Sequence, residues 1–182
     1  MEWQGLCNYK YSSGINYLDF EQINGNLNAL IGANKSGKSS IIDILVFLLF
    51  NRSFKSGCSD LINADGKHFY CRICLIAGEV KYEIIRHGKG TKTSLQLLQN
   101  GVNISKETIP ATYSFITNNI VGSYENFLNI NLAYQGGPEF ISYSGKKQMD
   151  YLYKVLKIDR LLEMSSKCRL SNRTAKTQIN SM

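Results

Sequence analysis

Residues 32–40 read GANKSGKSS, and this stretch restricts the possible folds more than any other. Two glycines stand five positions apart and are followed by Lys38 and Ser39, which is the pattern G-x-x-x-x-G-K-[ST]. Glycines let the backbone curl with its N–H groups pointing inward, which makes a concave anion site. The lysine supplies a point charge to β- and γ-phosphates, and the serine hydroxyl can complete the shell of a Mg²⁺ ion. The pattern therefore predicts a loop, here called the P-loop (residues 32–39), that holds a nucleoside triphosphate.

The flanking sequence is the context that such a loop needs. LNALI (27–31) is short, apolar and ended by Gly32, so it predicts a buried strand. SSIIDILVFLLF (39–50) is largely apolar over more than three turns and has no proline, so it predicts a packed helix. The alternative is a chance match in a glycine-rich loop, which average residue usage would produce in roughly one such chain per hundred or fewer. Strand, loop and helix together favour an α/β fold with a real phosphate site.

Composition excludes several classes of protein. The 182 residues suffice for one domain of ordinary size. No apolar run reaches the roughly 18 to 20 residues that cross a bilayer, and the longest spans Ile44 to Phe50. The N-terminus, MEWQGLCNYK, lacks the basic start and apolar stretch of a signal peptide. We expect a soluble, intracellular protein with no membrane partner, in the cytoplasm, the nucleus or a viral factory.

The five cysteines form an odd, scattered set, which is typical of reduced thiols. CRIC (71–74) resembles a metal or redox pair, but no second cysteine pair accompanies it and neither histidine stands at a zinc-finger spacing. It lies in the alternating run HFYCRICLIA (68–77), where residues three apart point to opposite faces of a strand. Two ordinary strand cysteines are the favoured interpretation.

Positive charge is concentrated at one end of the chain. Residues 140–182 carry nine basic and three acidic side chains, a net charge of +6 out of +7 for the whole chain. Such a concentration suits a polyanion such as DNA. A solvated helix face that happens to favour lysine explains the charge equally well.

Strands are predicted both before the P-loop and after the P-loop helix. WQGLCNYKYSSGINYLDF (3–20) predicts an antiparallel hairpin around Ser12-Ser13-Gly14. Residues 51–67 are polar and glycine-broken, which predicts a loop. Asn100-Gly101 is a strong hairpin signal. The predicted strands of this meander are HFYCRICLIA (68–77), EVKYEIIRH (79–87) and TSLQLLQ (93–99).

The last third of the chain reads as mostly helical. Pro110 can open a helix over 111–121. NFLNINLAYQGG (126–137) predicts a strand that runs into a glycine-ended loop. Beyond Gly145 there is neither glycine nor proline, and a 3-4 spacing gives a weak coiled-coil seam, apolar at five of seven positions. That seam would comprise Leu161, Met164, Cys168, Ser171, Ala175, Gln178 and Met182.

The order of these parts resembles the N-terminal lobe of SMC-like ATPases, in the SbcC-type branch of DNA double-strand-break processing proteins. That family begins with an N-[FY]-[KR]-x-[YS] strand, here NYKYS (8–12), followed by LDF (18–20). Its P-loop reads G-x-N-G-x-G-K-[ST]-S-[IL], here GANKSGKSSI (32–41), and a helix of the type DAIxFALF follows, here DILVFLLF (43–50).

The later part of the chain continues the resemblance. NLAYQGG (131–137) matches the family's Q-loop, and FISYSGKKQMDYLYKVLKIDRLLE (140–163) matches the basic helix and turn that lead into a long coiled coil. The P-loop alone is shared by many unrelated proteins, whereas this combination is specific. The sequence of these motifs is most similar to that of phage and large-virus members of the family. The resemblance implies an ABC-type P-loop NTPase N-terminal lobe at 1–158 and the start of a coiled coil at 159–182.

Functional roles follow from the resemblance, residue by residue. Gln135 would reach Mg²⁺ and the attacking water, although a surface amide beside two glycines is the alternative. Lys10 would sit near the nucleotide, and a solvated strand lysine is equally plausible. Lys38 would be catalytic and Ser39 a metal ligand. ATP would be cradled by Asn34, Lys35, Ser36, Gly37, Lys38, Ser39 and Ser40.

One P-loop position departs from the family pattern. The family usually has glycine where this chain has Lys35, at a sharp bend of the loop. A side chain there costs about 1 kcal/mol if the backbone needs a positive φ. It also brings an extra cation near the phosphates, so we expect nucleotide affinity to depend on this residue.

An ATPase of this family needs elements that this sequence does not contain. It needs an apolar strand that ends in Asp-Glu, and a serine-glycine signature from the opposite subunit; LKID (156–159) and SYSGKK (142–147) match neither. We expect half of an ATPase head, as a fragment, a truncated gene or one piece of a split protein. The implied partners are a C-terminal ATPase lobe, a second head in a homodimer, an SbcD-type nuclease subunit and DNA. A small P-loop phosphotransferase and a nucleotide-binding remnant without turnover are the alternatives.

Overall fold

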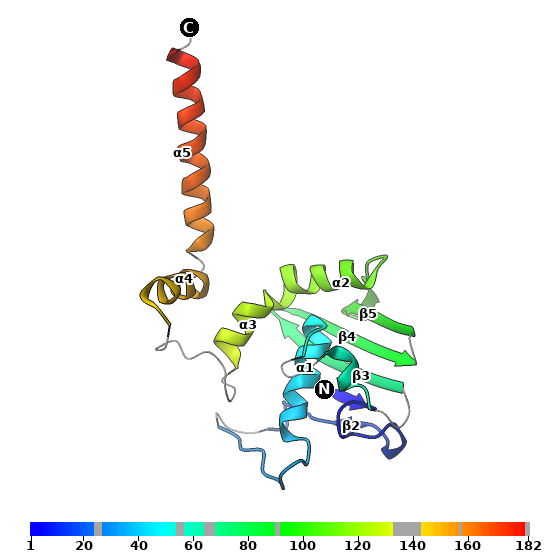
Figure 1. Ribbon diagram of the computed structural model, residues 1–182. Coiled ribbons are helices and arrows are strands. Elements are labelled where there is room, and N and C mark those ends of the chain that lie inside the picture. The colour runs from blue at the N-terminus through cyan, green and yellow to red at the C-terminus, as the bar shows by residue number, and fades with distance from the viewer. Residues whose placement is uncertain are drawn as a thin grey trace. The chain divides into compact units, whose positions relative to one another are not determined.

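The computed structural model describes residues 1–23, 27–53, 57–63, 68–89, 92–132, 143–156 and 158–180 (Figure 1). Contacts divide the chain into two compact units, Met1–Gly122 and Ser123–Met182, and each is described by itself. None of the helices in these ranges combines the length and the apolar character that a bilayer-spanning segment needs.

A six-stranded antiparallel sheet forms the first unit, in the order β2-β1-β3-β4-β5-β6. The predicted meander is confirmed, and its first strand is confirmed to the residue. At Asn100 and Gly101 the φ angles are 49° and 84°, which is the left-handed backbone that a tight hairpin turn requires. The strands are β1 (Glu2–Gln4), β2 (Asn16–Tyr17), β3 (His68–Ala77), β4 (Val80–Lys89), β5 (Lys92–Gln99) and β6 (Val102–Asn103).

The N-terminal hairpin is shorter than predicted. β1 pairs antiparallel with β2, with Glu2 opposite Tyr17. The strand expected at NYKYS (8–12) is wrong, because Tyr9 makes only an isolated bridge to Leu6 and η1 (Tyr11–Ser13) is a 3₁₀ turn. Residues 6–7 pair instead with the predicted loop after α1. Leu6 bridges to Ile62, and the Cys7 N–H donates to the carbonyl of buried Leu61 at the end of η2 (Cys58–Leu61).

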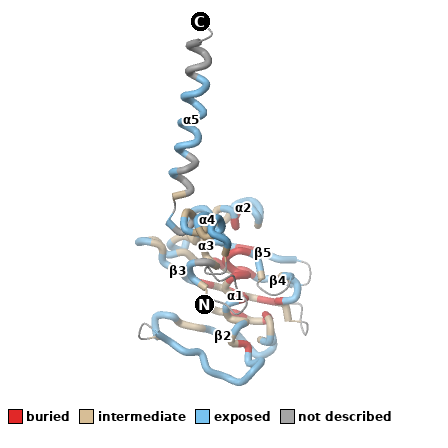
Figure 2. The backbone as a smooth tube through the Cα atoms, turned by 60° about the vertical axis from the view of Figure 1, so that its left-hand side comes forward, coloured by how far each residue is buried: buried red, intermediate tan, exposed pale blue. Residues whose placement is uncertain are grey.

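Two helices cover one face of this sheet and enclose the core (Figure 2). The predicted P-loop helix is confirmed as α1 (Lys38–Phe50), which lies on β3 and β4. The helix that Pro110 opens is α2 (Ile109–Ile116), which lies on β5 and continues as the π-helical turn η3 (Thr117–Val121). Thr108 caps α2, because its side chain accepts from the Ala111 N–H. Fully buried side chains from both helices and three strands form the core: Ile44, Phe47, Leu48, Phe69, Ile84, Leu97 and Ile116.

A buried arginine joins the two helices to the sheet. Arg86 on β4 is 6% exposed, and its guanidinium carbon lies 4.0 Å from the centroid of the Phe47 ring. Its Nη1 donates to Tyr113 Oη at 3.0 Å and to the Phe47 carbonyl at 3.4 Å. Stacking on an aromatic face and hydrogen bonding offset the desolvation of a buried cation.

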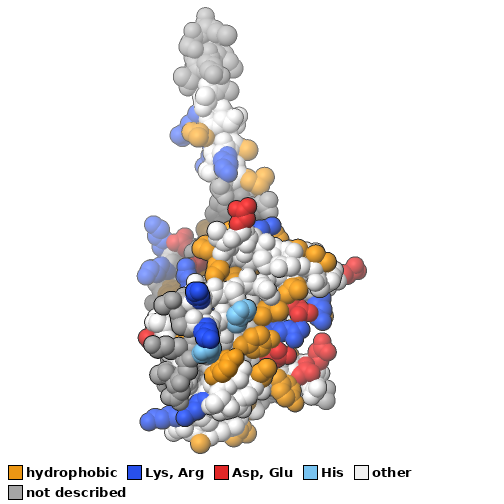
Figure 3. Space-filling view, turned by 90° about the vertical axis from the view of Figure 1, so that its right-hand side faces the viewer, with side chains coloured by type: hydrophobic (Ala, Val, Ile, Leu, Met, Phe, Trp, Pro, Cys, Tyr) orange, Lys and Arg blue, Asp and Glu red, His pale blue; other side chains and the backbone are white. Residues whose placement is uncertain are grey.

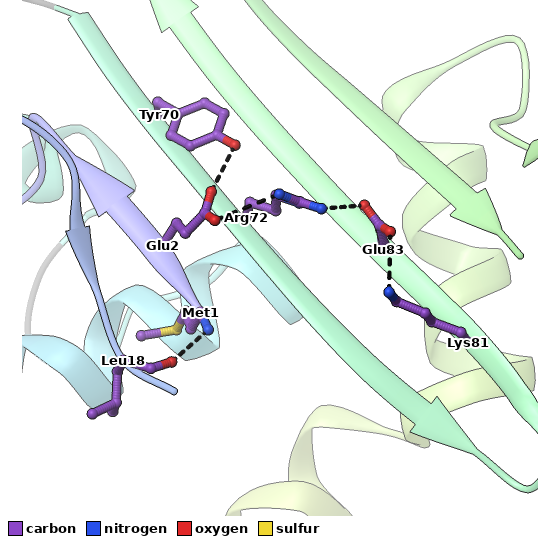
Figure 4. A network of polar contacts seen from close by, with 7 residues as sticks. All are labelled: Met1, Glu2, Leu18, Tyr70, Arg72, Lys81 and Glu83. Atoms are coloured by element: carbon purple, nitrogen blue, oxygen red, sulfur yellow. Dashed lines mark hydrogen bonds and ion pairs between the residues drawn. The ribbon is translucent and has the colours of Figure 1, made fainter. Parts of the chain in front are cut away.

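The opposite face of the sheet is polar and carries a chain of ion pairs (Figure 4). Arg72 lies between Glu2 and Glu83, at 3.5 Å and 2.7 Å, and Lys81 lies 3.8 Å from Glu83. Tyr70 Oη donates to Glu2 at 3.1 Å. This network extends from β1 across β3 to β4, so it aligns three strands of the uncovered face.

The two cysteines of CRIC lie on opposite faces of β3, as predicted. Cys71 is completely buried against the helices, and Cys74 is exposed on the polar face. Both are free thiols. Their side chains therefore cannot act as a chelating pair, because a strand points residues three apart in opposite directions.

The buried strand predicted at 27–31 is wrong. These residues form no strand, and Leu27, Leu30 and Ile31 are 93%, 58% and 90% exposed. A strand needs a neighbour for its backbone hydrogen bonds. In the described part of the chain every strand belongs to the antiparallel sheet, which leaves this apolar segment outside the core.

The second unit consists of helices. The strand predicted at 126–137 is wrong over its first six residues, which belong to α3 (Tyr124–Asn131); residues 133–137 lie outside the described ranges. Ser123 caps this helix by accepting from the Asn126 N–H, which explains why helix wins locally. The predicted helical structure beyond Gly145 is confirmed as α4 (Gly145–Val155) and α5 (Asp159–Asn180). Whether α5 pairs as a coiled coil stays a prediction, as does the domain boundary at residue 158.

Candidate functional site

The P-loop makes a sharp turn directly before α1. Two of its residues have left-handed backbone, Lys35 with a φ of 65° and Gly37 with a φ of 95°. Gly37 is also the N-cap of α1, and it provides no side-chain cap. The first N–H groups of a helix have no intrahelical partner, so an N-terminus without a capping side chain attracts an anion.

A pocket of about 340 Å³ lies over this helix end. Its lining comes almost entirely from the loop, and it contains two lysines and, among the described residues, no acidic side chain. The hydroxyl-bearing Ser39 is exposed toward solvent. The residues that line the pocket are Asn8, Asn34, Lys35, Ser36, Gly37, Lys38, Ser39 and Ser40.

The side chain of Lys38 folds back over the loop. Its Nζ donates to the carbonyl oxygens of Gly32 and Ala33, each at 2.7 Å. A Cβ at position 32 would lie 2.9 Å from the hydroxyl of Ser36, so a side chain there would require that hydroxyl to shift. The Lys38 ammonium group is thus held at the start of the P-loop by two carbonyl oxygens, which a stronger acceptor such as a phosphate oxygen can replace.

Two residues from the N-terminal segment brace the loop from outside the motif. Asn8 Nδ2 donates to the Lys35 carbonyl at 2.9 Å, which holds the strained bend. Tyr9 Oη donates to the Gly37 carbonyl at 3.2 Å. The Tyr9 ring packs edge-on against the Trp3 ring, with the ring centroids 5.3 Å apart. Burial raises the pKa of Tyr9, and Cys7 raises it further, so this hydroxyl keeps its proton.

The predicted loop residues are brought together around this pocket. Asn34 to Ser40 all line it, and their roles toward a ligand stay predictions. Lys10 is exposed at the start of η1 and does not line the pocket. Gln135 lies outside the described residues. Sequence reasoning missed Asn8 and Tyr9, and their place in NYKYS, the stretch most similar to the family's first strand, was the available signal.

The chain matches a known family of P-loop proteins. The profile of the AAA domain family matches residues 6–180, nearly the whole chain. The chain belongs to the AAA domain family. Membership in this P-loop ATPase family implies nucleotide binding, in agreement with the pocket at the start of α1.

Three individual proteins are similar in sequence to most of this chain. An uncharacterized protein of Acanthamoeba polyphaga mimivirus is 25% identical over 87% of this chain and 13% of its own length. The DNA double-strand break repair Rad50 ATPase of Thermoplasma acidophilum is 27% identical over 82% of this chain and 18% of its own. The protein of the same name from Methanocaldococcus jannaschii is 31% identical over 72% of this chain and 13% of its own.

The predicted resemblance is therefore confirmed, both to a double-strand-break repair ATPase and to a protein of a large virus. This AAA domain spans only 13% to 18% of the length of these three relatives.

Proposed function

We propose that this AAA domain is the ATP-binding N-terminal lobe of a Rad50-type, ABC-class ATPase head. The observation that carries the proposal is the P-loop pocket at an uncapped helix end, with Lys38 at its mouth and Asn8 and Tyr9 bracing it from outside. A concave loop with inward-pointing backbone N–H groups, two lysines and a serine hydroxyl can bind a triphosphate with its Mg²⁺ ion.

Each part of the loop has a role in this proposal. The N–H groups at the start of α1 bind the β-phosphate, and Lys38 exchanges its two carbonyl acceptors for phosphate oxygens. Ser39, exposed at the first turn of α1, would hold Mg²⁺ through its hydroxyl. When bound, Mg²⁺ would neutralise charge on the phosphates. Gln135, predicted as a further Mg²⁺ ligand and as the residue that orients the attacking water, completes the set.

Hydrolysis requires a second lobe in this proposal. The sequence contains no apolar strand ending in Asp-Glu and no serine-glycine signature. The segment 27–31 lies directly before the P-loop and exposes apolar side chains. Because exposed apolar clusters mark interfaces, this segment supports the proposal that another lobe packs here. A C-terminal lobe that adds strands beside this segment would cover it and supply the acidic residues, and two such heads would associate around ATP.

The biological role is proposed from the relatives. Three archaeal relatives carry the name DNA double-strand break repair Rad50 ATPase. We extend that role to this chain, with a nuclease subunit of the SbcD type as partner. The basic α4–α5 region, at residues 145–180, is the proposed DNA contact, through phosphates and without sequence preference.

Calorimetric titration with ATP and Mg²⁺ tests the proposal. We expect saturable binding by the wild type and none by Lys38→Ala, which leaves the core intact and removes the charge from the phosphates. Lys81→Ala, a lysine of β4 outside the P-loop pocket, is the matched control and should bind like the wild type. Unchanged ATP affinity in Lys38→Ala would refute the P-loop assignment. Phosphate transfer from ATP to a nucleoside monophosphate would instead favour a small phosphotransferase.

A further inference from the structure

A second pocket, of about 430 Å³, lies at one end of the sheet. Gln4, Tyr70 and His87 stand opposite one another on β1, β3 and β4, on the face that α1 and α2 leave uncovered. The pocket shares no lining residue with the P-loop pocket. The side chains that matter here are Gln4, Tyr11, His68, Tyr70, His87 and Lys89.

Aromatic rings form the wall of this second pocket. Tyr11 and His68 lie in contact, with ring centroids 5.4 Å apart and planes inclined by 47°. The side-chain amide of Gln4 donates to the Tyr11 carbonyl, which ties η1 to the sheet. Tyr11 is 42% exposed, so a ligand can reach its ring without rearrangement of the fold.

The rim of the pocket is basic. Lys89 lines it, and its cross-strand neighbour Lys92 is also exposed. The described lining contains no acidic residue, and the nearby Glu2 is already engaged by Tyr70 and Arg72. On the face shown in Figure 3, histidine side chains lie beside lysine or arginine side chains and next to a hydrophobic strip.

The His87 ring is held in place at the same site. Ser94 Oγ on β5 lies 2.9 Å from His87 Nε2 and 3.1 Å from Nδ1. A held imidazole presents its flat face at a fixed position, while its nitrogen edge faces Ser94. The pocket therefore combines preorganised flat rings with cations and no acidic residue in its described lining.

We propose that this pocket binds one unpaired nucleotide of a single-stranded nucleic acid. The base stacks on the exposed Tyr11 ring, with the inclined His68 ring beside it, and the adjoining phosphates lie against Lys89 and Lys92. Stacking on aromatic side chains beside a basic groove is how proteins hold single strands without sequence preference. A base inside a duplex has both faces covered by its neighbours, so the site selects unpaired strands. This site is independent of ATP binding at the P-loop.

Fluorescence anisotropy with three labelled probes tests this proposal. The probes are a thymidine oligomer of about 15 nucleotides, an abasic oligomer of equal length and a blunt duplex. We expect the full chain to bind the thymidine oligomer more tightly than the abasic one. Tyr11→Ala should weaken thymidine binding about tenfold and leave abasic binding unchanged, because only the base stacks.

Further variants separate stacking from charge and from folding. Lys89→Ala should weaken both single-stranded probes equally and reduce the salt slope by about one. Tyr11→Leu keeps apolar bulk without a ring and should behave like Tyr11→Ala, provided that thermal unfolding matches the wild type. Tyr17→Ala, a 73% exposed tyrosine of β2, and Lys81→Ala are the matched controls. Lys38→Ala should bind single strands normally, which distinguishes this site from the P-loop.

Several outcomes would overturn the proposal. Equal affinity for the thymidine and abasic oligomers would show that no base is stacked. Retained affinity in both Tyr11 variants would place any single-strand site elsewhere. Tight binding of a glutamate-rich peptide that depends on Tyr11 would assign the pocket to an acidic peptide instead.

Discussion

Tyr9 and Gly37 hold each other in place, although 28 positions separate them in the sequence. The tyrosine Oη donates to the glycine carbonyl at 3.2 Å, and a Cβ on Gly37 would lie 2.9 Å from that same oxygen. The glycine is therefore required twice, by its φ of 95° and by the approach of the ring. The shape of the P-loop depends on a residue outside the motif.

Gly37→Ala should destabilise the first unit by about 2 kcal/mol, because it adds left-handed strain and a clash with the Tyr9 ring. Tyr9→Phe should cost only about 1 kcal/mol, since it removes one hydrogen bond. Urea unfolding measures both. In a double-mutant cycle, Tyr9→Ala should relieve part of the Gly37→Ala penalty. Strict additivity would show that the ring does not press on the loop.

Lys35→Gly should stabilise the chain by about 1 kcal/mol, because the structure gives Lys35 a φ of 65°. The same change should weaken ATP binding, because it removes a cation from the pocket. Lys35→Ala is the control that removes the charge and keeps the strain. Urea unfolding should separate the two variants, whereas ATP titration should not. Equal stability of the two variants would contradict a strained bend at this position.

Cys71 should make the fold sensitive to alkaline pH. Burial raises the pKa of Cys71 from 9.0 to about 12, although the charge of Arg86 lowers it somewhat. A raised folded-state pKa contributes stability that is fully present below pH 9 and is lost as pH rises from 9 toward 12. The free energy of unfolding should therefore fall less steeply over this range in Cys71→Ala than in the wild type.

Thiol labelling at neutral pH gives an independent check of the same residue. Exposed Cys74 and Cys168 should react within the mixing time of a thiol-specific reagent, and Cys71 only when the unit unfolds. Mass spectrometry of the labelled peptides identifies which thiol reacted. Rapid labelling of Cys71 would contradict its place beneath α1.

The exposed segment before the P-loop should bind hydrophobic dyes when the chain is alone. Leu27→Ser and Ile31→Ser should lower anilinonaphthalene sulfonate fluorescence and any self-association seen by sedimentation, because they remove an apolar cluster. Ile76→Ser is the control, since Ile76 is 69% exposed on the polar face of the sheet. Fluorescence that falls equally in the control would show that the segment is not a distinct surface.

Truncation after Ile158 should leave ATP binding unchanged, because the P-loop pocket is lined by residues 8 and 34–40. DNA affinity should fall, since the change removes Arg160, Lys167, Arg169, Arg173 and Lys176, and also two acidic residues, a net loss of three positive charges. Titrations of duplex DNA at several salt concentrations should show a shallower salt dependence after truncation. Undiminished DNA affinity would place the duplex-binding surface elsewhere, on the sheet of the first unit.

The sequence by itself determined the elements whose signals are local. HFYCRICLIA alternates with the period of a strand, so β3 was predicted to the residue and its cysteines were placed on opposite faces. Asn100-Gly101 specified its own turn, and Pro110 the start of a helix. The P-loop sequence specified the pocket residues from Asn34 to Ser40, and the family pattern identified position 35 as a strained bend.

Tertiary structure decided what depends on partners distant in the sequence. LNALI is as apolar as a buried strand, yet it is exposed, because burial requires a neighbouring strand and the described sheet offers it none. NFLNIN satisfies the apolar spacing of a strand, but the cap at Ser123 makes it helical. Tyr9 reaches the P-loop, and Tyr11 reaches His68, only because β1 lies next to β3 in the folded sheet. Local periodicity fixes the type of each element, whereas hydrogen-bond partners and packing neighbours fix its exposure and its contacts.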